Sequence, residues 1–228
     1  MKDNLSVCYW NIRSLCAEKI PYVPKTDIIA ISETWLRDGE SVPIPGYEET
    51  NFYNTDLHPN AKRGNGGLAV YTHKSIKNCT KLIKGSKHIV WLEYSKSDTC
   101  KPIAIAFIYF PPGHNGNSWF QELEEDLAGF ACSHETLVLG DFNAHTHNTL
   151  DFDHDEDSPF DSFSLSEPLQ RRYLRRRETC DTRQPNDYGK QLIEMCIASN
   201  HLILNGRTNG DPTGTYTRCE NESKSVVD

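Results

Sequence analysis

The sequence lacks the features of a membrane protein, a secreted protein or a zinc finger. No apolar run approaches the roughly 18 residues that a membrane span needs. The N-terminal sequence MKDNLS has no signal-peptide pattern of basic, apolar and small regions. The eight cysteines form no Cys-x-x-Cys pair, and no histidines stand at zinc-finger spacing. We therefore expect a protein that is not secreted, does not bind a membrane and keeps its thiols reduced.

The chain also lacks a linker, an internal repeat and a net positive charge. Without a proline-rich or low-complexity linker, its 228 residues are expected to form a single domain over residues 1–228. The formal net charge of -8 argues against holding nucleic acid by bulk electrostatics. The charge is uneven, however, because residues 151–161 are acidic and the basic sequence QRRYLRRR follows closely.

The pattern of apolar residues predicts an α/β fold. Apolar runs bounded by turn or polar residues predict strands at residues 5–10, 27–32, 67–72, 89–94, 102–109, 136–140 and 202–205. Helical periodicity predicts helices at residues 118–132 and 188–199. Several strands are apolar almost throughout, as expected for strands covered on both faces. Residues 146–186 are polar and irregular, which predicts an insertion that is either a functional surface loop or disordered.

Chemically capable side chains stand at the ends of the predicted strands. The first strand is followed by Asn11, the second by Glu33, and the fifth ends on Tyr109. The sixth is followed by Asp141 and Asn143. Because side chains leave the core where strands end, these groups are expected to meet in a cleft.

This set of side chains suits hydrolysis of a phosphodiester, which needs charge neutralisation on the phosphate, an activated water and help for the leaving group. A hard cation such as Mg²⁺ is held by carboxylates and water, so Glu33 is a candidate metal ligand. Asp141 could orient or deprotonate the water, while Asn143 and Asn11 donate hydrogen bonds to the phosphate. Positioned proton transfer of this kind contributes roughly 100- to 10,000-fold.

Each of these residues, taken singly, has a plainer interpretation. Asp141 could form a turn or cap a helix, and Asn11 could form an Asx turn. Tyr109 could close one edge of the core. His145 and His147 could suggest a metal site, but an orienting or solvent-facing role is the alternative. Only the whole set favours a catalytic site.

The motifs WNIRSL, ISETWL, IYFPPG and LGDFNAH occur in the order found in the endonuclease/exonuclease/phosphatase family, which this chain resembles. LILNGRT and the final GTYTRCENESKSVVD are similar to the apurinic/apyrimidinic-endonuclease-like branch in LINE-type (non-LTR) retrotransposons. The resemblance covers residues 5–228. It implies a DNase I-like, four-layered α/β sandwich in which two mixed β-sheets pack face to face with helices outside.

The resemblance also assigns roles to the residues at the strand ends. By analogy Glu33 binds Mg²⁺, for which Mn²⁺ could substitute, and Asp141 activates or aligns water. Asn11 and Asn143 would hold the scissile phosphate. Tyr109 would contact the phosphate or metal-bound water.

Further positions are His145 in LGDFNAH and three residues that match late motifs of the family. His145, Thr215 and Ser225 would support the phosphate, and Asp228 matches the aspartate that orients a catalytic histidine. In the family that histidine follows in a Ser-Asp-His motif, whereas this sequence ends at Asp228. We therefore expect a C-terminally incomplete domain that misses its last strands, is weakly active or inactive, and is prone to aggregate.

The implied function is a Mg²⁺-dependent endonuclease that nicks double-stranded target DNA to prime reverse transcription. The resemblance implies a reverse transcriptase domain in the full-length protein, with synthesis in the cytoplasm and action in the nucleus. The basic run is a candidate contact for the DNA backbone, or else a solvated helix that balances the acidic stretch. It contains Arg171, Arg172, Arg175, Arg176 and Arg177.

Two other classes of function remain open at this point. The first is another enzyme of the same fold, such as an inositol-phosphate phosphatase, a sphingomyelinase-like hydrolase or an RNA deadenylase, because fold does not determine substrate. The second is a catalytically impaired remnant or nucleic-acid-binding fragment. The ending at Asp228 favours the remnant, and the intact set of strand-end residues favours the enzyme.

Overall fold

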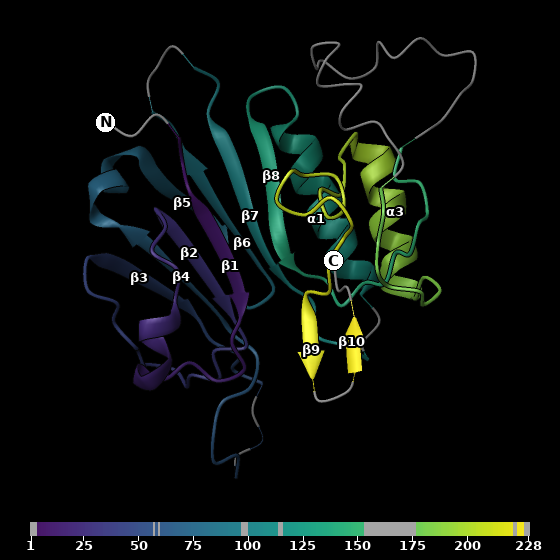
Figure 1. Ribbon diagram of the computed structural model, residues 1–228. Helices are drawn as coiled ribbons and strands as arrows, with labels where there is room; N and C mark the ends of the chain where they lie inside the picture. Colours follow the sequence, from purple (N-terminus) through teal and green to yellow (C-terminus); the bar gives the residue numbers. More distant parts are fainter. Residues whose placement is uncertain are drawn as a thin grey trace. The chain divides into compact units, whose positions relative to one another are not determined.

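The computed structural model describes residues 4–56, 58, 60–96, 100–113, 116–152, 177–220 and 223–225 (Figure 1). The chain forms two compact units. The first unit comprises Met1–Pro111 and Gly129–Asp141, and the second comprises Pro112–Ala128 and Phe142–Asp228. The single domain expected from the sequence stays a prediction. In the part of the chain described here, no helix is long and apolar enough to cross a membrane.

The first unit contains two mixed sheets of four strands each. One has the order β1-β2-β4-β3 and consists of β1 (Val7–Asn11), β2 (Ile28–Ser32), β4 (Leu68–His73) and β3 (Tyr47–Phe52). The other has the order β5-β6-β7-β8 and consists of β5 (Thr80–Gly85), β6 (Ile89–Tyr94), β7 (Ile103–Tyr109) and β8 (Glu135–Asp141). The pairs β1/β2 and β7/β8 are parallel, and the remaining pairs are antiparallel.

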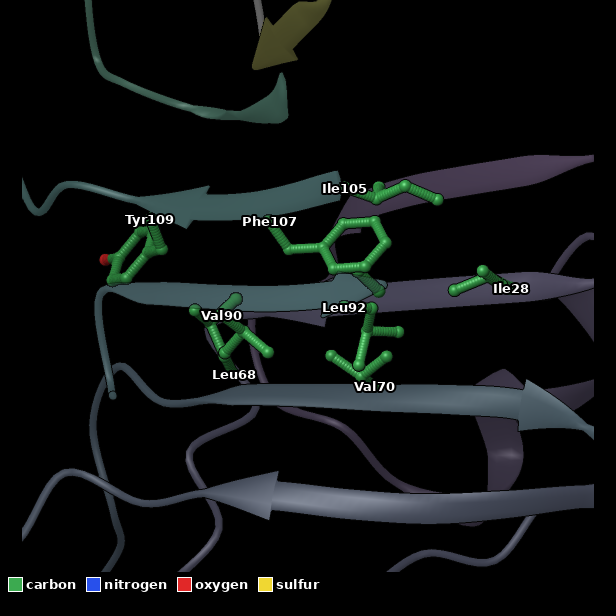
Figure 2. Close-up of a cluster of buried hydrophobic side chains, with 9 residues drawn as sticks. Ile28, Leu68, Val70, Val90, Leu92, Ile105, Phe107 and Tyr109 are labelled. Carbon is green, nitrogen blue, oxygen red and sulfur yellow. The ribbon is translucent and has the colours of Figure 1, made fainter. Parts of the chain in front are cut away.

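The two sheets pack face to face through a buried apolar cluster (Figure 2). One sheet contributes Ile28, Ala30, Leu68 and Val70, and the other contributes Val90, Leu92, Ile105, Phe107 and Tyr109. Full burial of a large apolar side chain stabilises a fold by about 1.5–3 kcal/mol before the entropy cost of ordering it. This layer therefore fixes the two sheets of the first unit against each other, as the sequence predicted.

β2 is buried along its whole length because both of its faces are covered. Ile28 and Ala30 point into the cluster between the sheets. Ile29 and Ile31 point the other way, into a second buried cluster that includes Tyr71. This alternation follows from the two-residue period of a strand and confirms the prediction from the continuous apolar run.

The second unit contains most of α1 (Asn117–Phe130), all of α3 (Asp187–Ser199), and the antiparallel pair β9 (Arg218–Glu220) and β10 (Ser223–Ser225). The stripe Phe120, Leu123 and Leu127 of α1 is buried. The ring of Phe120 lies 6.0 Å from that of Phe142 and 6.2 Å from that of Tyr188. These aromatic contacts join α1 to α3 within the second unit.

Caps set the limits of α3. The side chain of Asn186 accepts a hydrogen bond from the amide of Gly189, and Asn200 ends the helix in the left-handed conformation at a φ of 58°. Both are common devices at helix termini. The helices predicted at residues 118–132 and 188–199 therefore match α1 and α3 to within two residues at each end.

The predicted strand at residues 202–205 is wrong, because these residues form no helix or strand. The amide of Ile203 donates to the Asp151 carboxylate, and the carbonyl of Leu204 accepts from the Arg207 amide, so side-chain and turn bonds replace a ladder. The sequence also missed the polar strands β3, β5, β9 and β10, and the short 3-10 helices η1 (Ala17–Tyr22) and η2 (Lys74–Cys79). Of residues 146–186, the described residues 146–152 and 177–186 contain no helix or strand.

Candidate catalytic site

The two parallel strand pairs of the first unit end on the predicted functional residues. In the register of β1 and β2, Asn11 lies beside Ser32, and Glu33 follows directly. In the register of β7 and β8, Tyr109 lies beside Asp141. β1 and β8 are edge strands of different sheets, and they contact each other. The carboxyl ends of both parallel pairs therefore supply one site.

The carboxamide of Asn11 joins the two sheets at this site. Its Nδ2 donates to Glu33 Oε1 at 2.9 Å and to Asp141 Oδ2 at 2.8 Å. Its Oδ1 is buried and has no hydrogen-bond partner in the described structure. A buried amide oxygen without a partner is costly, so this atom is an acceptor or ligand that the site leaves available.

Tyr109 completes the cluster from β7. The pKa of Tyr109 is raised well above its ordinary value, chiefly by burial of the phenol. The negative charge of Glu33, the hydrogen bond between Glu33 and the phenol, and the charge of Asp141 raise this pKa further, and the Arg13 cation partly opposes the rise. The phenol therefore stays protonated at neutral pH and acts as a hydrogen-bond donor. Asn11, Glu33, Tyr109 and Asp141 are thus brought together as the sequence predicted.

Glu33 is held in a left-handed backbone conformation with a φ of 52°, and Trp35 shares this conformation at 56°. Such residues cost on the order of 1–3 kcal/mol each, so their neighbours must hold them in place. The amide of Trp35 donates to the carbonyl of Gly66 at 3.0 Å. A Cβ on Gly64 would lie 2.5 Å from the carbonyl oxygen of Trp35, so only glycine allows this close approach. Non-glycine residues in this conformation cluster at functional sites.

Asn143 and His145 belong to the second unit, where Asn186 holds their backbone. Asn143 has a φ of 50°, and its carbonyl accepts a hydrogen bond from Asn186 Nδ2 at 2.8 Å. The amide of His145 donates to Asn186 Oδ1 at 3.0 Å. The cap of α3 therefore also sets the path of the chain that follows Asp141.

The imidazole of His145 is oriented by Asp181, with 3.1 Å between His145 Nδ1 and Asp181 Oδ2. Burial pushes the pKa of Asp181 upward, but hydrogen bonds and charge from Arg183, together with the charge of His145, hold it below its ordinary value. Asp181 is therefore an ionised acceptor that sets the ring orientation of His145. The sequence alone did not indicate Asp181, Arg183 and Asn186, because they lie far from residues 143–145 in the chain and belong to no motif.

The remaining predicted residues are placed as follows. Thr215 is exposed, and its amide and hydroxyl donate to Asp211 Oδ1 at 2.8 and 3.0 Å in a local turn. Ser225 is the last residue of β10. The described residues do not include five of the predicted positions, which are Asp228, Arg171, Arg172, Arg175 and Arg176.

Arg177 does not fit the exposed DNA contact proposed for it. Its side chain is buried, and the guanidinium donates to the hydroxyl of Thr146 and, at 2.7 Å, to the carbonyl of His147. His147 itself has a left-handed φ of 49°. An arginine buried against the Thr146 hydroxyl and the His147 carbonyl supports the local backbone, so Arg177 is removed from the proposed set of DNA contacts.

The donor atoms of the first-unit site suit a hard divalent cation. Glu33 and Asp141 offer carboxylate oxygens, and Asn11 offers its buried, unpartnered amide oxygen. Among the described residues there is no group of three or more His, Cys, Asp and Glu side chains that could hold a metal. An ion at this site would therefore have few protein ligands and would complete its coordination shell with water and phosphate oxygens. Such coordination is typical of Mg²⁺ rather than of structural zinc.

Comparison with known proteins agrees with this architecture. The chain is 25% identical over 145 residues, 61% of its length, to a probable RNA-directed DNA polymerase from transposon BS of Drosophila melanogaster, and it spans 15% of that relative's length.

Solved structures with the same fold include the endonuclease domain of TRAS1, a telomere-specific non-LTR retrotransposon, with a TM-score of 0.54 and 13% identity over 99% of this chain and 82% of that one. A 3'-5' exonuclease from Neisseria meningitidis has a TM-score of 0.53 and 12% identity over 96% and 80% of the two chains. Residues 7–218 match the model of one family, so this chain belongs to the Endonuclease/Exonuclease/phosphatase family.

Proposed function

We propose that this protein is a metal-dependent phosphodiesterase that nicks DNA. The observation that carries the proposal is the hydrogen-bonded bridge from Asn11 to both Glu33 and Asp141, which joins one carboxylate from each sheet at a single site. Members of the family are hydrolytic nucleases and phosphatases, and they generally depend on a divalent metal.

Each residue of the bridge has a role in the proposed reaction. Mg²⁺ or Mn²⁺ bound through Glu33 would supply charge neutralisation at the phosphate. The Asp141 carboxylate accepts the proton of the attacking water, and Asn11 holds that carboxylate in its orientation. Tyr109 has a single O–H, which is hydrogen-bonded to Glu33, and this O–H would turn to a phosphate oxygen when the substrate binds. For Asn143, which belongs to the second unit, the family resemblance of the motif LGDFNAH is the basis for proposing a phosphate contact.

Retrotransposition is the biological setting that we propose. The support is the similarity to a transposon RNA-directed DNA polymerase and the fold shared with a retrotransposon endonuclease domain. Target DNA would then be double-stranded, the nick would prime reverse transcription, and a reverse transcriptase domain would act with this one. Synthesis in the cytoplasm and action in the nucleus follow from the same proposal.

A plasmid-nicking assay tests the proposed activity. Supercoiled DNA is incubated with the protein and Mg²⁺, and conversion to the open circle is expected to stop when EDTA removes the cation. Asp141→Asn should lower the rate by roughly 100- to 10,000-fold because the proton acceptor is lost. Glu33→Gln should also lower the rate and raise the Mg²⁺ concentration required.

Glu48→Gln is the matched control, because Glu48 is an exposed residue of β3 whose carboxylate pairs with Lys77 on the surface. It should nick at the wild-type rate. If the protein hydrolyses inositol phosphates or RNA but does not nick DNA, it is an enzyme of another branch of the family. Equal activity of the wild-type, Glu33→Gln and Asp141→Asn proteins would overturn the assigned site.

A further inference from the structure

Lys19 binds the turn that follows the first strand in an unusual way. Its ammonium Nζ donates to three successive backbone carbonyl oxygens, those of Ile12 at 2.8 Å, Arg13 at 2.8 Å and Ser14 at 2.9 Å. The lysine lies in η1 and is half-buried. Surface lysines commonly extend their charge into water, whereas all three donors of this ammonium are directed at one turn.

The turn needs this cation because of its backbone conformation. Arg13 and Ser14 have left-handed φ angles of 48° and 78°, which non-glycine residues rarely adopt. In this turn three successive carbonyl oxygens converge on one point, where their partial negative charges repel one another. An ammonium at that point offsets the repulsion and satisfies the carbonyls. Lys19 therefore stabilises a left-handed turn that the residue types Arg13 and Ser14 do not favour.

The same turn is joined to the catalytic site on both sides. It starts from Asn11, whose carboxamide bridges Glu33 and Asp141. The amide of Ser14 donates to the carbonyl of Glu33 at 2.7 Å, and the amide of Leu15 donates to that of Thr34 at 2.8 Å. A shift of the turn would therefore displace both the bridging carboxamide and the backbone of Glu33.

Arg13 gives the turn a second connection with the site. It is exposed at the surface, and its charge is one of the influences on the Tyr109 phenol. The position of this cation depends on the left-handed turn that Lys19 holds.

We infer that Lys19 is a positioning residue of the catalytic site, whose ammonium fixes the left-handed turn so that Asn11 and Glu33 keep the geometry needed for phosphodiester hydrolysis. The inference rests on the proposed function for its effect on catalysis. Its structural part, the ammonium holding the turn, can be tested whether or not the protein cleaves DNA.

Kinetics of Lys19→Met and Lys19→Ala test the catalytic part. Misplacement of catalytic groups should lower kcat by on the order of 10- to 100-fold, while the KM for DNA changes little because Lys19 uses its donors within the protein. Lys25→Met is the matched control, since Lys25 is an exposed lysine close by in the chain, and it should keep the wild-type kcat.

Two forms of rescue separate positioning from general damage to the fold. Methylammonium should restore kcat to Lys19→Ala with saturation, whereas tetramethylammonium, which cannot donate a hydrogen bond, should not. In the Lys19→Met background, Ser14→Gly should restore part of the activity because glycine adopts a φ near 78° without strain. Lost activity without either rescue would contradict the positioning role.

Amide hydrogen exchange gives a readout that is independent of cleavage. Exchange of the Ser14 and Leu15 amides should accelerate in Lys19→Met, while the amides of Ile29 and Ala30 in β2 keep their wild-type rates. If the wild-type protein cleaves no phosphodiester, the proposed function fails and this measurement still tests the turn. Unchanged protection of Ser14 and Leu15 in Lys19→Met would overturn the inference about Lys19.

Discussion

The two units of the molecule hold their functional segments by different means. In the first unit the catalytic residues stand at the ends of regular strands, and two apolar clusters fix those strands. In the second unit the segments around residues 143–152 and 201–211 form no helix or strand, and polar side chains such as Asn186 and the buried Arg207 hold them. The strand ends that carry the catalytic residues of the first unit are thus held by backbone ladders and apolar burial, and the irregular segments of the second unit by individual side-chain hydrogen bonds.

The ion pair of Asp151 and Arg207 is the clearest example in the second unit. Both side chains are completely buried, and the two guanidinium nitrogens donate to the two carboxylate oxygens at 2.6 Å each. The carboxylate also accepts from the amide of Ile203 at 2.7 Å, and Arg207 donates to the carbonyl of Ile203 at the same distance. The pair therefore satisfies the backbone of a segment that has no ladder partner.

The largest expected effect comes from breaking this pair. Asp151→Ala leaves the Arg207 guanidinium buried without its counter-charge and should destabilise the second unit by about 3–5 kcal/mol. Amide exchange of α3 measures the loss within that unit. Lys190→Ala removes the exposed pair with Asp187 and should change the same quantity by less than about 1 kcal/mol.

A double replacement distinguishes the charge from the backbone contacts. Asp151→Leu with Arg207→Met removes both charges, and such replacements are often neutral when only the ion pair matters. Here we expect partial recovery, because Ile203 loses both of its side-chain partners. Complete recovery of the stability of the second unit would show that the hydrogen bonds to Ile203 do not stabilise it. The difference drawn between the two units would then lose this support.

Asn186→Ala should have the next largest effect. It removes a helix cap that contributes about 0.5–2 kcal/mol, together with the bonds to Asn143 and His145. We expect lower stability of α3 by amide exchange and reduced nicking by the proposed enzyme. Asn209→Ala, at an exposed position of the same unit, serves as the control. If Asn186→Ala is clearly destabilised but nicks at the wild-type rate, the cap stabilises α3 without affecting catalysis.

Ile105→Val should have the smallest effect and tests the first unit. Ile105 is fully buried between the sheets, and loss of one methylene there should cost about 0.5–1.5 kcal/mol by amide exchange of β7. Ile83→Val, on the partly exposed strand β5, should cost less. Because the ladders and the whole apolar cluster hold the strand ends, loss of one buried methylene should not move them. Ile105→Val should therefore nick at the wild-type rate, and a large drop would contradict this view of the first unit.

Much of the first unit could be predicted from the sequence because the information was local. Each buried strand is a continuous apolar run, and each catalytic side chain stands where such a run ends, as at Glu33 after β2 and Asp141 at the end of β8. The strands β3 and β5 escaped prediction because they are only partly covered and their sequences are largely polar. Their place in the sheets depends on the neighbours with which they pair.

The sequence by itself determined the apolar strands, the helices α1 and α3, and the residue types that meet at the site, because periodicity and strand ends are properties of neighbouring residues. Only the tertiary structure decided that Asn11 bridges Glu33 and Asp141 and that Lys19 donates to three successive carbonyl oxygens. The burial of Arg177 was likewise decided by the tertiary structure. Those outcomes depend on which buried polar groups find partners, and the partners are often supplied by distant parts of the chain.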